Sequence, residues 1–261
     1  MPVIEKTSKD DALYRLRHSL AHVMAQAVTK QYPGTLLGFG PPIDDGFYYD
    51  FLFPEGVTLS DQDLPRIEKE MRKIIAADQA FVREELAAAD ALARIEKMQE
   101  PHKLEYAKEL IEQGGHESLS FYTNGPFLDM CEGPHVESTK QLPKDGFKLH
   151  SVAGAYWRGD EKNVMLTRIY AYAFPDKATV KAHRAAVQEA KRRDHRKLGR
   201  ELGIYVIDDE VGKGLPLWLP NGAIIRRELE QLAYETEFRY GYLPVSTPHI
   251  TKESLYWTSG H

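Results

Sequence analysis

Two pairs of polar side chains, far apart along the chain, constrain its fold more than any other feature. His18 and His22 stand in the segment HSLAH, and Cys131 and His135 stand in DMCEGPH, more than a hundred residues later. Both pairs have i, i+4 spacing, which on a helix places two side chains on one face. If the pairs form a single site, the fold must bring the second pair back to the first.

The segment around the first pair is predicted to be a helix from Asp11 to Lys30. Its apolar residues recur at 3.6-residue spacing and form one stripe. On a helical wheel, His18 and His22 fall on the side opposite this stripe. They therefore either face water or belong to a second buried face that lines a cavity. The stripe consists of Leu13, Leu16, Leu20, Val23, Met24 and Ala27.

The chemistry of these side chains leaves several interpretations open. Zinc takes tetrahedral His and Cys ligands, so the four residues suit a metal site. The HExxH protease pattern is excluded, because Ser19 follows His18 and no glutamate is available as base. Asp129 alternates with Cys131 along a predicted strand, so its carboxylate can orient an imidazole or a water there. The alternatives are an ordinary strand-end aspartate and four unrelated surface residues.

Composition indicates a soluble globular chain. The 261 residues are 42% hydrophobic and 28% charged, with room for one large or two modest domains. No run approaches the ~18 apolar residues of a membrane span, so no membrane partner is expected. One cysteine excludes an internal disulfide framework and fits a reducing compartment, which predicts a cytoplasmic protein.

Charge is concentrated in one segment. Residues 177–200 hold nine Lys/Arg and two acids, a local charge of +7, which leaves −12 for the rest of a chain whose net charge is −5. Such an imbalance favours contact with the phosphates of a nucleic acid, and the alternative is a solvated helix face. The candidate phosphate-binding residues are Arg192, Arg193, Arg196 and Lys197.

The rest of the first 174 residues predicts helices mixed with antiparallel strands. Residues 35–51 are rich in Gly and Pro and end in aromatic residues, which predicts short strands and a hairpin. Ser60 and Asp61 are expected to open a second helix. Residues 119–174 read as strands, with a hairpin that has Asn124-Gly125 at its turn.

The C-terminal part is predicted to be organised differently. One long helix is expected from Pro175 to about Leu202, followed by a short strand and an amphipathic helix over residues 223–241. The boundary between domains is placed within residues 175–203. The fold class that follows is α+β.

Six segments stand in this order along the chain: HSLAHVMAQAV, GPPIDDGFYYDF, DMCEGPH, AGAYWRGD, AKRRDHRKLGREL and GYLPVSTPHI. Together they resemble the threonyl-tRNA synthetase family, whose members are class II ligases that attach threonine to tRNA(Thr). The resemblance covers almost the whole chain. It implies that residues 1–174 form an editing domain that hydrolyses mischarged Ser-tRNA(Thr), that residues 175–202 form a basic linker helix, and that residues 203–261 begin the catalytic domain.

The resemblance also implies roles for individual residues. Lys103 or His18 is expected to hold the water or the leaving hydroxyl, Asp129 to bind the seryl group, and Tyr49 to pack by the terminal adenosine; the general base stays open. Related alanyl editing proteins bind zinc with a similar pattern, whereas the threonyl site is understood to work without metal. We therefore expect no metal, with His18, His22, Cys131 and His135 as the fallback zinc set. The implied catalytic residues are His18, His22, Lys103, Asp129, Cys131 and His135.

The last residues resemble class II motif 1, from Gly241 to Pro248, whose long helix and proline-ended strand build a dimer interface. A homodimer is therefore expected for the full-length enzyme. The motifs that bind ATP follow later in the family, so ATP, Mg²⁺ and Zn²⁺ are expected only for that part, and residues 1–261 are not expected to activate threonine. The alternatives are a catalytically silent tRNA-binding or dimerising module and a zinc-dependent trans-editing deacylase.

Overall fold

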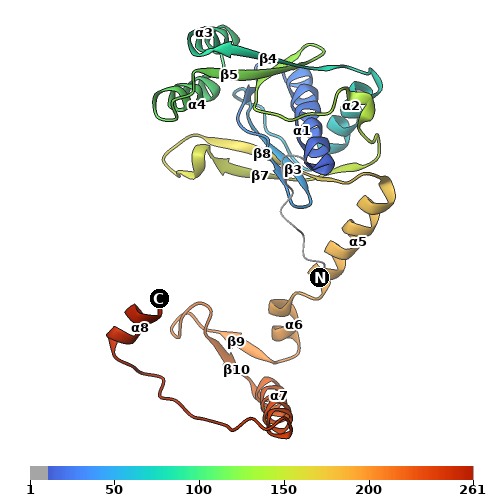
Figure 1. Cartoon of the computed structure of the whole chain (residues 1–261). Helices are drawn as coiled ribbons and strands as arrows, with labels where there is room; N and C mark the ends of the chain where they lie inside the picture. The colour runs from blue at the N-terminus through green and yellow to red at the C-terminus, as the bar shows by residue number, and fades with distance from the viewer. Residues whose placement is uncertain (1–10, 261) are drawn as a thin grey trace. The chain divides into compact units, whose positions relative to one another are not determined.

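The computed structural model describes residues 11–260 and divides into two compact units, Met1–Ala185 and Ala186–His261 (Figure 1). The ends of the expected first and last domains, residues 1–10 and 261, lie outside the described residues. Helices and antiparallel sheets are mixed in the first unit, which confirms the α+β fold class. Within the described part, no helix is both long and apolar enough to cross a bilayer.

A five-stranded antiparallel sheet supports the larger core of the first unit. Its order is β1-β3-β8-β7, with β2 paired to β3. Helices α1 and α2 cover one face of this sheet (Figure 1). The elements are α1 (Ala12–Gln31), β1 (Leu36–Leu37), β2 (Pro42–Ile43), β3 (Gly46–Leu52), α2 (Leu64–Ala76), β7 (Phe147–Tyr156) and β8 (Met165–Ala173).

Strand alternation decides which β3 side chains enter the core. Phe47, Tyr49 and Phe51 share one face of the strand and are buried. Phe47 and Phe51 pack with Leu20 and Met24 of α1 in the same cluster. Each such apolar side chain contributes about 1.5–3 kcal/mol by leaving water. Packing therefore holds Tyr49, which lies between two core phenylalanines, facing inward.

A three-stranded sheet with two helices forms the smaller core. Ile95, Ala107 and Phe121 are completely buried there. The hairpin of β5 and β6 was predicted and is confirmed, but its turn residues are Gly125 and Pro126, between the paired Asn124 and Phe127. Gly125 has φ 58°, which a glycine adopts without strain. The elements are β4 (Phe81–Ala87), α3 (Ala88–Met98), α4 (Pro101–Glu112), β5 (Ser118–Asn124) and β6 (Phe127–Met130).

Helix α1 confirms the first predicted helix and has a second buried face. Ser19, His22 and Gln26 are exposed by only 0%, 2% and 4% on the side away from the apolar stripe. The polar face predicted from the sequence is therefore turned toward the interior of the first unit. Of the two alternatives for this face, the structure selects the cavity wall.

The start of the second predicted helix was placed too early. Helix α2 begins at Leu64, because the preceding residues form a turn in which the amide and hydroxyl of Ser60 both donate to Asp63 at 3.0 Å. A side chain that bonds the backbone in this way competes with helix formation.

The single long helix predicted after Pro175 is wrong. The structure has α5 (Lys177–Arg192) and α6 (His195–Glu201), separated at Asp194. The Asp194 carboxylate accepts hydrogen bonds from the backbone amides of Arg196 and Lys197, so it acts as the N-cap of a new helix. The segment over residues 175–202 is basic, but it is not one continuous rod.

The second unit also contains β9 (Tyr205–Ile207), β10 (Pro216–Trp218), α7 (Pro220–Arg239) and α8 (Glu253–Ser259). Helix α7 confirms that a helix forms here, but it buries no apolar face, and large apolar side chains such as Leu229 and Phe238 are 61% and 70% exposed. Among the described residues of 242–251 no strand forms, unlike the proline-ended strand implied by the resemblance. A strand requires a paired neighbour for its backbone groups, and none is provided there.

Candidate functional site

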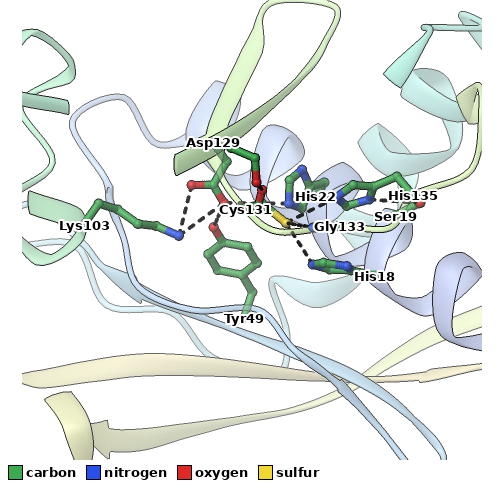
Figure 2. A network of polar contacts seen from close by, with 10 residues as sticks. His18, Ser19, His22, Tyr49, Lys103, Asp129, Cys131, Gly133 and His135 are labelled. Carbon is green, nitrogen blue, oxygen red and sulfur yellow. Dashed lines mark hydrogen bonds and ion pairs between the residues drawn. The ribbon is translucent and has the colours of Figure 1, made fainter. Parts of the chain in front are cut away.

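The first unit contains a cavity of about 590 Å³ lined by α1, β3, α4 and the end of β6. Six of the seven residues that the sequence placed in the editing site line this cavity, and His135 lies beside it in contact with Cys131 (Figure 2). The structure thus brings the two distant pairs together, as one site requires. The lining members are His18, His22, Tyr49, Lys103, Asp129 and Cys131.

One side of the cavity, the carboxylate side, is built around Asp129. Lys103 Nζ lies 3.0 Å from Oδ1 and 3.3 Å from Oδ2, and both side chains are nearly completely buried. The Tyr49 hydroxyl donates to Oδ2 at 2.5 Å. His22 Nε2 lies 3.8 Å from the same oxygen. A buried cation, a phenol and an imidazole therefore converge on one carboxylate (Figure 2).

The opposite side, the sulfur side, is built around Cys131. Its Sγ lies 3.2 Å from His18 Nε2 and 3.4 Å from His135 Nε2. The Gly133 amide donates to the same sulfur at 3.3 Å. This cluster contains no carboxylate, so it is neutral wherever the imidazoles are unprotonated.

Ser19 completes the sulfur side, and the sequence analysis did not identify it as a site residue. Its Oγ lies 3.1 Å from His135 Nδ1 and accepts a hydrogen bond from the Val136 amide at 3.0 Å. The hydroxyl thereby fixes the ring of His135 against α1. Its position next to His18 on a helix was the available signal, but the i, i+4 pattern directed attention to the histidines alone.

Burial controls protonation in this cavity. It lowers the pKa of His22 well below the usual value, helped by the charges of His135 and His18, and it lowers the pKa of His135 to about 2. Burial, followed by the charge of Asp129, raises the pKa of the Cys131 thiol to about 12. At neutral pH these two imidazoles are therefore unprotonated. The thiol is protonated and is therefore a poor nucleophile.

The expected fallback zinc set, His18, His22, Cys131 and His135, fits a zinc ion in size. Their ligand atoms lie within 4.8 Å of one another. The two sulfur–nitrogen distances, 3.2 and 3.4 Å, approach the ~3.5 Å expected between tetrahedral zinc ligands. The buried ammonium of Lys103, bound to Asp129 in the same cavity, opposes a second cation. If zinc were held by His18, His22, Cys131 and His135, it would act as a Lewis acid.

Two aromatic residues behind Lys103 were also not identified from the sequence. Lys103 Nζ lies 5.3 Å from the ring centre of Phe39, which stacks on Trp157 with centroids 5.0 Å apart. The Trp157 indole donates to Glu105 of α4 at 3.1 Å. The segment AGAYWRGD, which contains Trp157, is therefore hydrogen-bonded to α4, the helix that carries Lys103.

The predicted phosphate-binding residues lie in the second unit and are exposed. Each has an acidic partner nearby. Arg192 and Arg193 pair with Glu189 at 2.8 and 2.5 Å. Arg196 pairs with Asp194 at 2.8 Å, and Lys197 lies 4.0 Å from Glu201.

The two residues that delimit the motif 1 match also belong to the second unit. Gly241 has φ 84° and follows Tyr240, the C-cap residue of α7. Pro248 lies in the exposed segment without regular structure. Neither residue lines the cavity of the first unit.

Comparison with known proteins identifies the relatives of this chain. A family model described as "Threonyl and Alanyl tRNA synthetase second additional domain" matches residues 119–170, which include Asp129, Cys131 and His135. A threonine–tRNA ligase of Gloeobacter violaceus is 47% identical over 259 residues, and one of Halalkalibacterium halodurans is 48% identical over 254 residues.

These alignments cover 99% and 97% of this chain but only 40% and 38% of the two relatives. The chain therefore spans about two fifths of the length of the curated relatives it matches. A threonine–tRNA ligase of Rubrobacter xylanophilus gives the same result, with 48% identity over 96% of this chain. The identity of 47–48% extends over nearly the whole length of this chain, and the matched domain includes residues of the cavity. The chain therefore belongs to the threonyl-tRNA synthetase family.

Proposed function

We propose that this chain hydrolyses the ester bond of Ser-tRNA(Thr) and so removes serine attached to the wrong tRNA. The observation that carries this proposal is the buried contact of Asp129 with Lys103 and Tyr49 in a cavity that His18 and His22 also line. Opposite charges beside unprotonated bases suit a polar substrate that carries both an amine and an ester.

The need for such a site follows from the small difference between the two amino acids. Threonine has one methyl group more than serine, and a pocket discriminates a single methyl or methylene by only ~1–3 kcal/mol. A second site that admits the smaller serine and excludes threonine by its size supplies the remaining selectivity. The packed walls of this cavity, where Tyr49 is held by the core, suit exclusion by size.

The residues divide the work of ester hydrolysis between them. In this proposal Asp129 binds the seryl group, and Lys103 or His18 holds the attacking water or the leaving ribose hydroxyl. The water oxygen bonds to the carbonyl carbon and loses a proton. The bond from that carbon to the ribose oxygen breaks, and the ribose oxygen takes up a proton, which leaves free serine and a ribose hydroxyl. Because the ester is already activated, correct placement of the water and the carbonyl supplies most of the required acceleration.

The proposed partners are tRNA(Thr) and its seryl ester, and the proposed location is the cytoplasm. Editing requires no cofactor in this proposal. ATP, Mg²⁺ and Zn²⁺ belong to the threonine-activating reaction of the complete ligase, and the homodimer belongs to the complete ligase as well. The exposed apolar side chains of α7 support an interface in that larger protein.

Deacylation of preformed Ser-tRNA(Thr) by the purified chain tests the editing proposal, with Thr-tRNA(Thr) as the control substrate. We expect hydrolysis of the seryl ester only. Equal hydrolysis of both esters, or none above the buffer rate, contradicts the proposal. A silent tRNA-binding module would bind the RNA but give the buffer rate of hydrolysis.

We also expect no threonine-dependent pyrophosphate exchange, and its detection would show that the chain activates threonine.

The basic segment is proposed to bind tRNA phosphates, and its salt dependence tests this. Replacing Arg192, Arg193, Arg196 and Lys197 with glutamine should weaken binding and lower the slope of log K against log salt by up to ~0.9 for each phosphate that is no longer neutralised. The slope should change less than it would on loss of four unpaired cations, because acidic neighbours already pair with these side chains. Lys69→Gln, on exposed α2 surface, is the control. An unchanged slope would show that these residues do not contact phosphates and that the segment is only a solvated connector.

A further inference from the structure

Glu100 connects the helix that carries Lys103 to the larger sheet. It is the N-cap residue of α4, and its carbonyl accepts the hydrogen bond of the Leu104 amide at 2.9 Å. Its side chain does not cap the helix. Instead, Oε2 accepts a hydrogen bond from the Leu37 amide of β1 at 2.8 Å.

This hydrogen bond joins the two cores of the first unit. Helix α4 packs through Ala107 into the smaller core, whereas Leu37 belongs to the larger core and pairs with Phe51 of β3. Strand β3 also carries Tyr49, which bonds Asp129. Glu100 therefore fixes the first turn of α4, where Lys103 is the third residue, against the strands that place Tyr49.

The rest of α4 has its own attachment to the large sheet. Glu105 accepts hydrogen bonds from the Trp157 indole at 3.1 Å and from Arg158 at 3.3 Å. Without the Glu100 hydrogen bond, the helix body would therefore stay docked and only its first turn would be freed. That turn includes Lys103, so the effect should be concentrated in the cavity.

Glu100 is also electrically coupled to the site. Burial is the main cause that raises its pKa to about 7, and the charge of Asp129 acts in the same direction. The Leu37 amide and the cation of Lys103 oppose this rise, and the charge of Glu100 in turn raises the pKa of Tyr49. Ionisation of this carboxyl group in the neutral range therefore alters the field at the Lys103–Asp129 pair.

We propose that Glu100 is a positioning residue for hydrolysis, which holds Lys103 Nζ at Asp129 by tying the first turn of α4 to the Leu37 amide. The inference rests on the proposed function of the cavity, and it assigns a role to a residue that does not touch the substrate.

Three substitutions of Glu100 separate the effect of its side-chain length, which determines contact with the Leu37 amide, from the effect of its charge. Glu100→Gln keeps the length and an oxygen acceptor but removes the charge, Glu100→Asp keeps the charge but is one methylene short of Leu37, and Glu100→Ala removes both. Single-turnover deacylation of Ser-tRNA(Thr) is measured from pH 5.5 to 8.5. The glutamine variant should stay within about threefold of wild type and lose any inflection near pH 7. The aspartate and alanine variants should lose about tenfold or more, because a shift of ~1 Å costs up to ~10²-fold.

A second measurement does not depend on activity. The ¹³Cε signal of Lys103, assigned by its loss in Lys103→Arg, should shift with pH near 7 in wild type and stay constant in Glu100→Gln. If the wild-type chain hydrolyses nothing, the proposed function fails, and this signal still decides whether Glu100 acts on Lys103.

The inference is overturned if Glu100→Gln is as damaging as Glu100→Ala, because charge rather than reach would then matter. Full activity in Glu100→Asp also overturns it. So does a Lys103 signal that is insensitive to Glu100, or a set of variants that lowers thermal stability and leaves the rate and its pH profile unchanged.

Discussion

The two sides of the cavity use opposite physical means to hold their side chains. On the carboxylate side, full charges meet at Asp129 and Lys103, at 3.0 Å and nearly without solvent. On the sulfur side, burial keeps Cys131 and His135 uncharged, with the thiol pKa at about 12 and the imidazole pKa at about 2. A charged pair tolerates no loss of one partner, whereas a neutral cluster does. The two sides should therefore respond differently to equivalent substitutions.

The largest effect is expected from removal of one charge on the carboxylate side. Asp129→Leu or Lys103→Met leaves the other charge buried without a partner, which costs about 3–5 kcal/mol of unfolding free energy. The double variant Asp129→Leu/Lys103→Met should recover most of this stability and none of the hydrolysis. Urea unfolding and deacylation of Ser-tRNA(Thr) measure both. Single variants as stable as wild type would show that the pair is not buried as a pair.

On the sulfur side, His18→Ala separates a catalytic role from a structural zinc site. We expect hydrolysis to fall by about 10²–10⁴-fold, as for loss of a group that handles a proton or positions water. The unfolding free energy should change by about 1 kcal/mol, since the hydrogen bond of His18 with the Cys131 sulfur is weak. His150→Ala, in the edge strand β7 and outside the lining of the cavity, is the control.

Zinc analysis completes this test, because loss of a structural zinc ligand would destabilise the domain severely. We expect substoichiometric zinc in the purified chain and no effect of a chelator on activity or melting temperature. Stoichiometric zinc, with activity lost on chelation and regained with zinc, would instead favour the metal-dependent deacylase.

Two partly buried groups, Glu100 at the start of the helix that carries Lys103 and His135 on the sulfur side, should respond to pH with opposite signs. Glu100 has a pKa raised from 4.5 to about 7, so between these values the folded chain holds a proton that the unfolded chain has released, and stability falls as pH rises. His135, with a pKa lowered from 6.5 to about 2, stays neutral where the unfolded residue is charged, so stability falls as pH drops below about 6.5.

Glu100→Gln should therefore remove a decline of about 2–3 kcal/mol between pH 4.5 and 7, after an allowance for partial solvent screening. The expected unfolding free energy of the variant then rises with pH over this range, because the histidine contribution remains. Denaturant unfolding at intervals of half a pH unit measures the curve. A variant curve parallel to that of wild type would show that Glu100 titrates normally in the folded chain.

Local patterns predicted much of this fold, and contacts between distant segments account for what they missed. The apolar stripe through Leu20 and Met24 identified α1, because periodicity is a property of the segment itself. The break before α6 was missed because Asp194 was counted as a charge rather than as a helix cap. The partner of Glu100 is the backbone of Leu37, and a backbone amide leaves no mark in the sequence.

The same distinction applies to the cavity. The paired spacing and the family resemblance supplied the seven residues that the structure brings together, although their catalytic roles stay predictions. The spacing could not show whether His18 and His22 face water, because that depends on β6 and the Cys131 loop folding over the polar side of α1. Ser19 was missed for this reason too, since its partner His135 is 116 residues away.

The smallest effect is expected for the thiol itself. Cys131→Ser keeps a small donor beside His18 and the Gly133 amide, so hydrolysis should fall by less than about tenfold and stability by about 1 kcal/mol. A thiolate nucleophile or zinc ligand would tolerate no such change.

Alkylation measures the protonation state of the thiol directly, because Cys131 is the one cysteine of the chain. With its pKa raised to about 12, it should react with iodoacetamide at pH 8 far more slowly than free cysteine. Fast alkylation would mean that the sulfur side carries a charge and that the contrast with the carboxylate side is wrong.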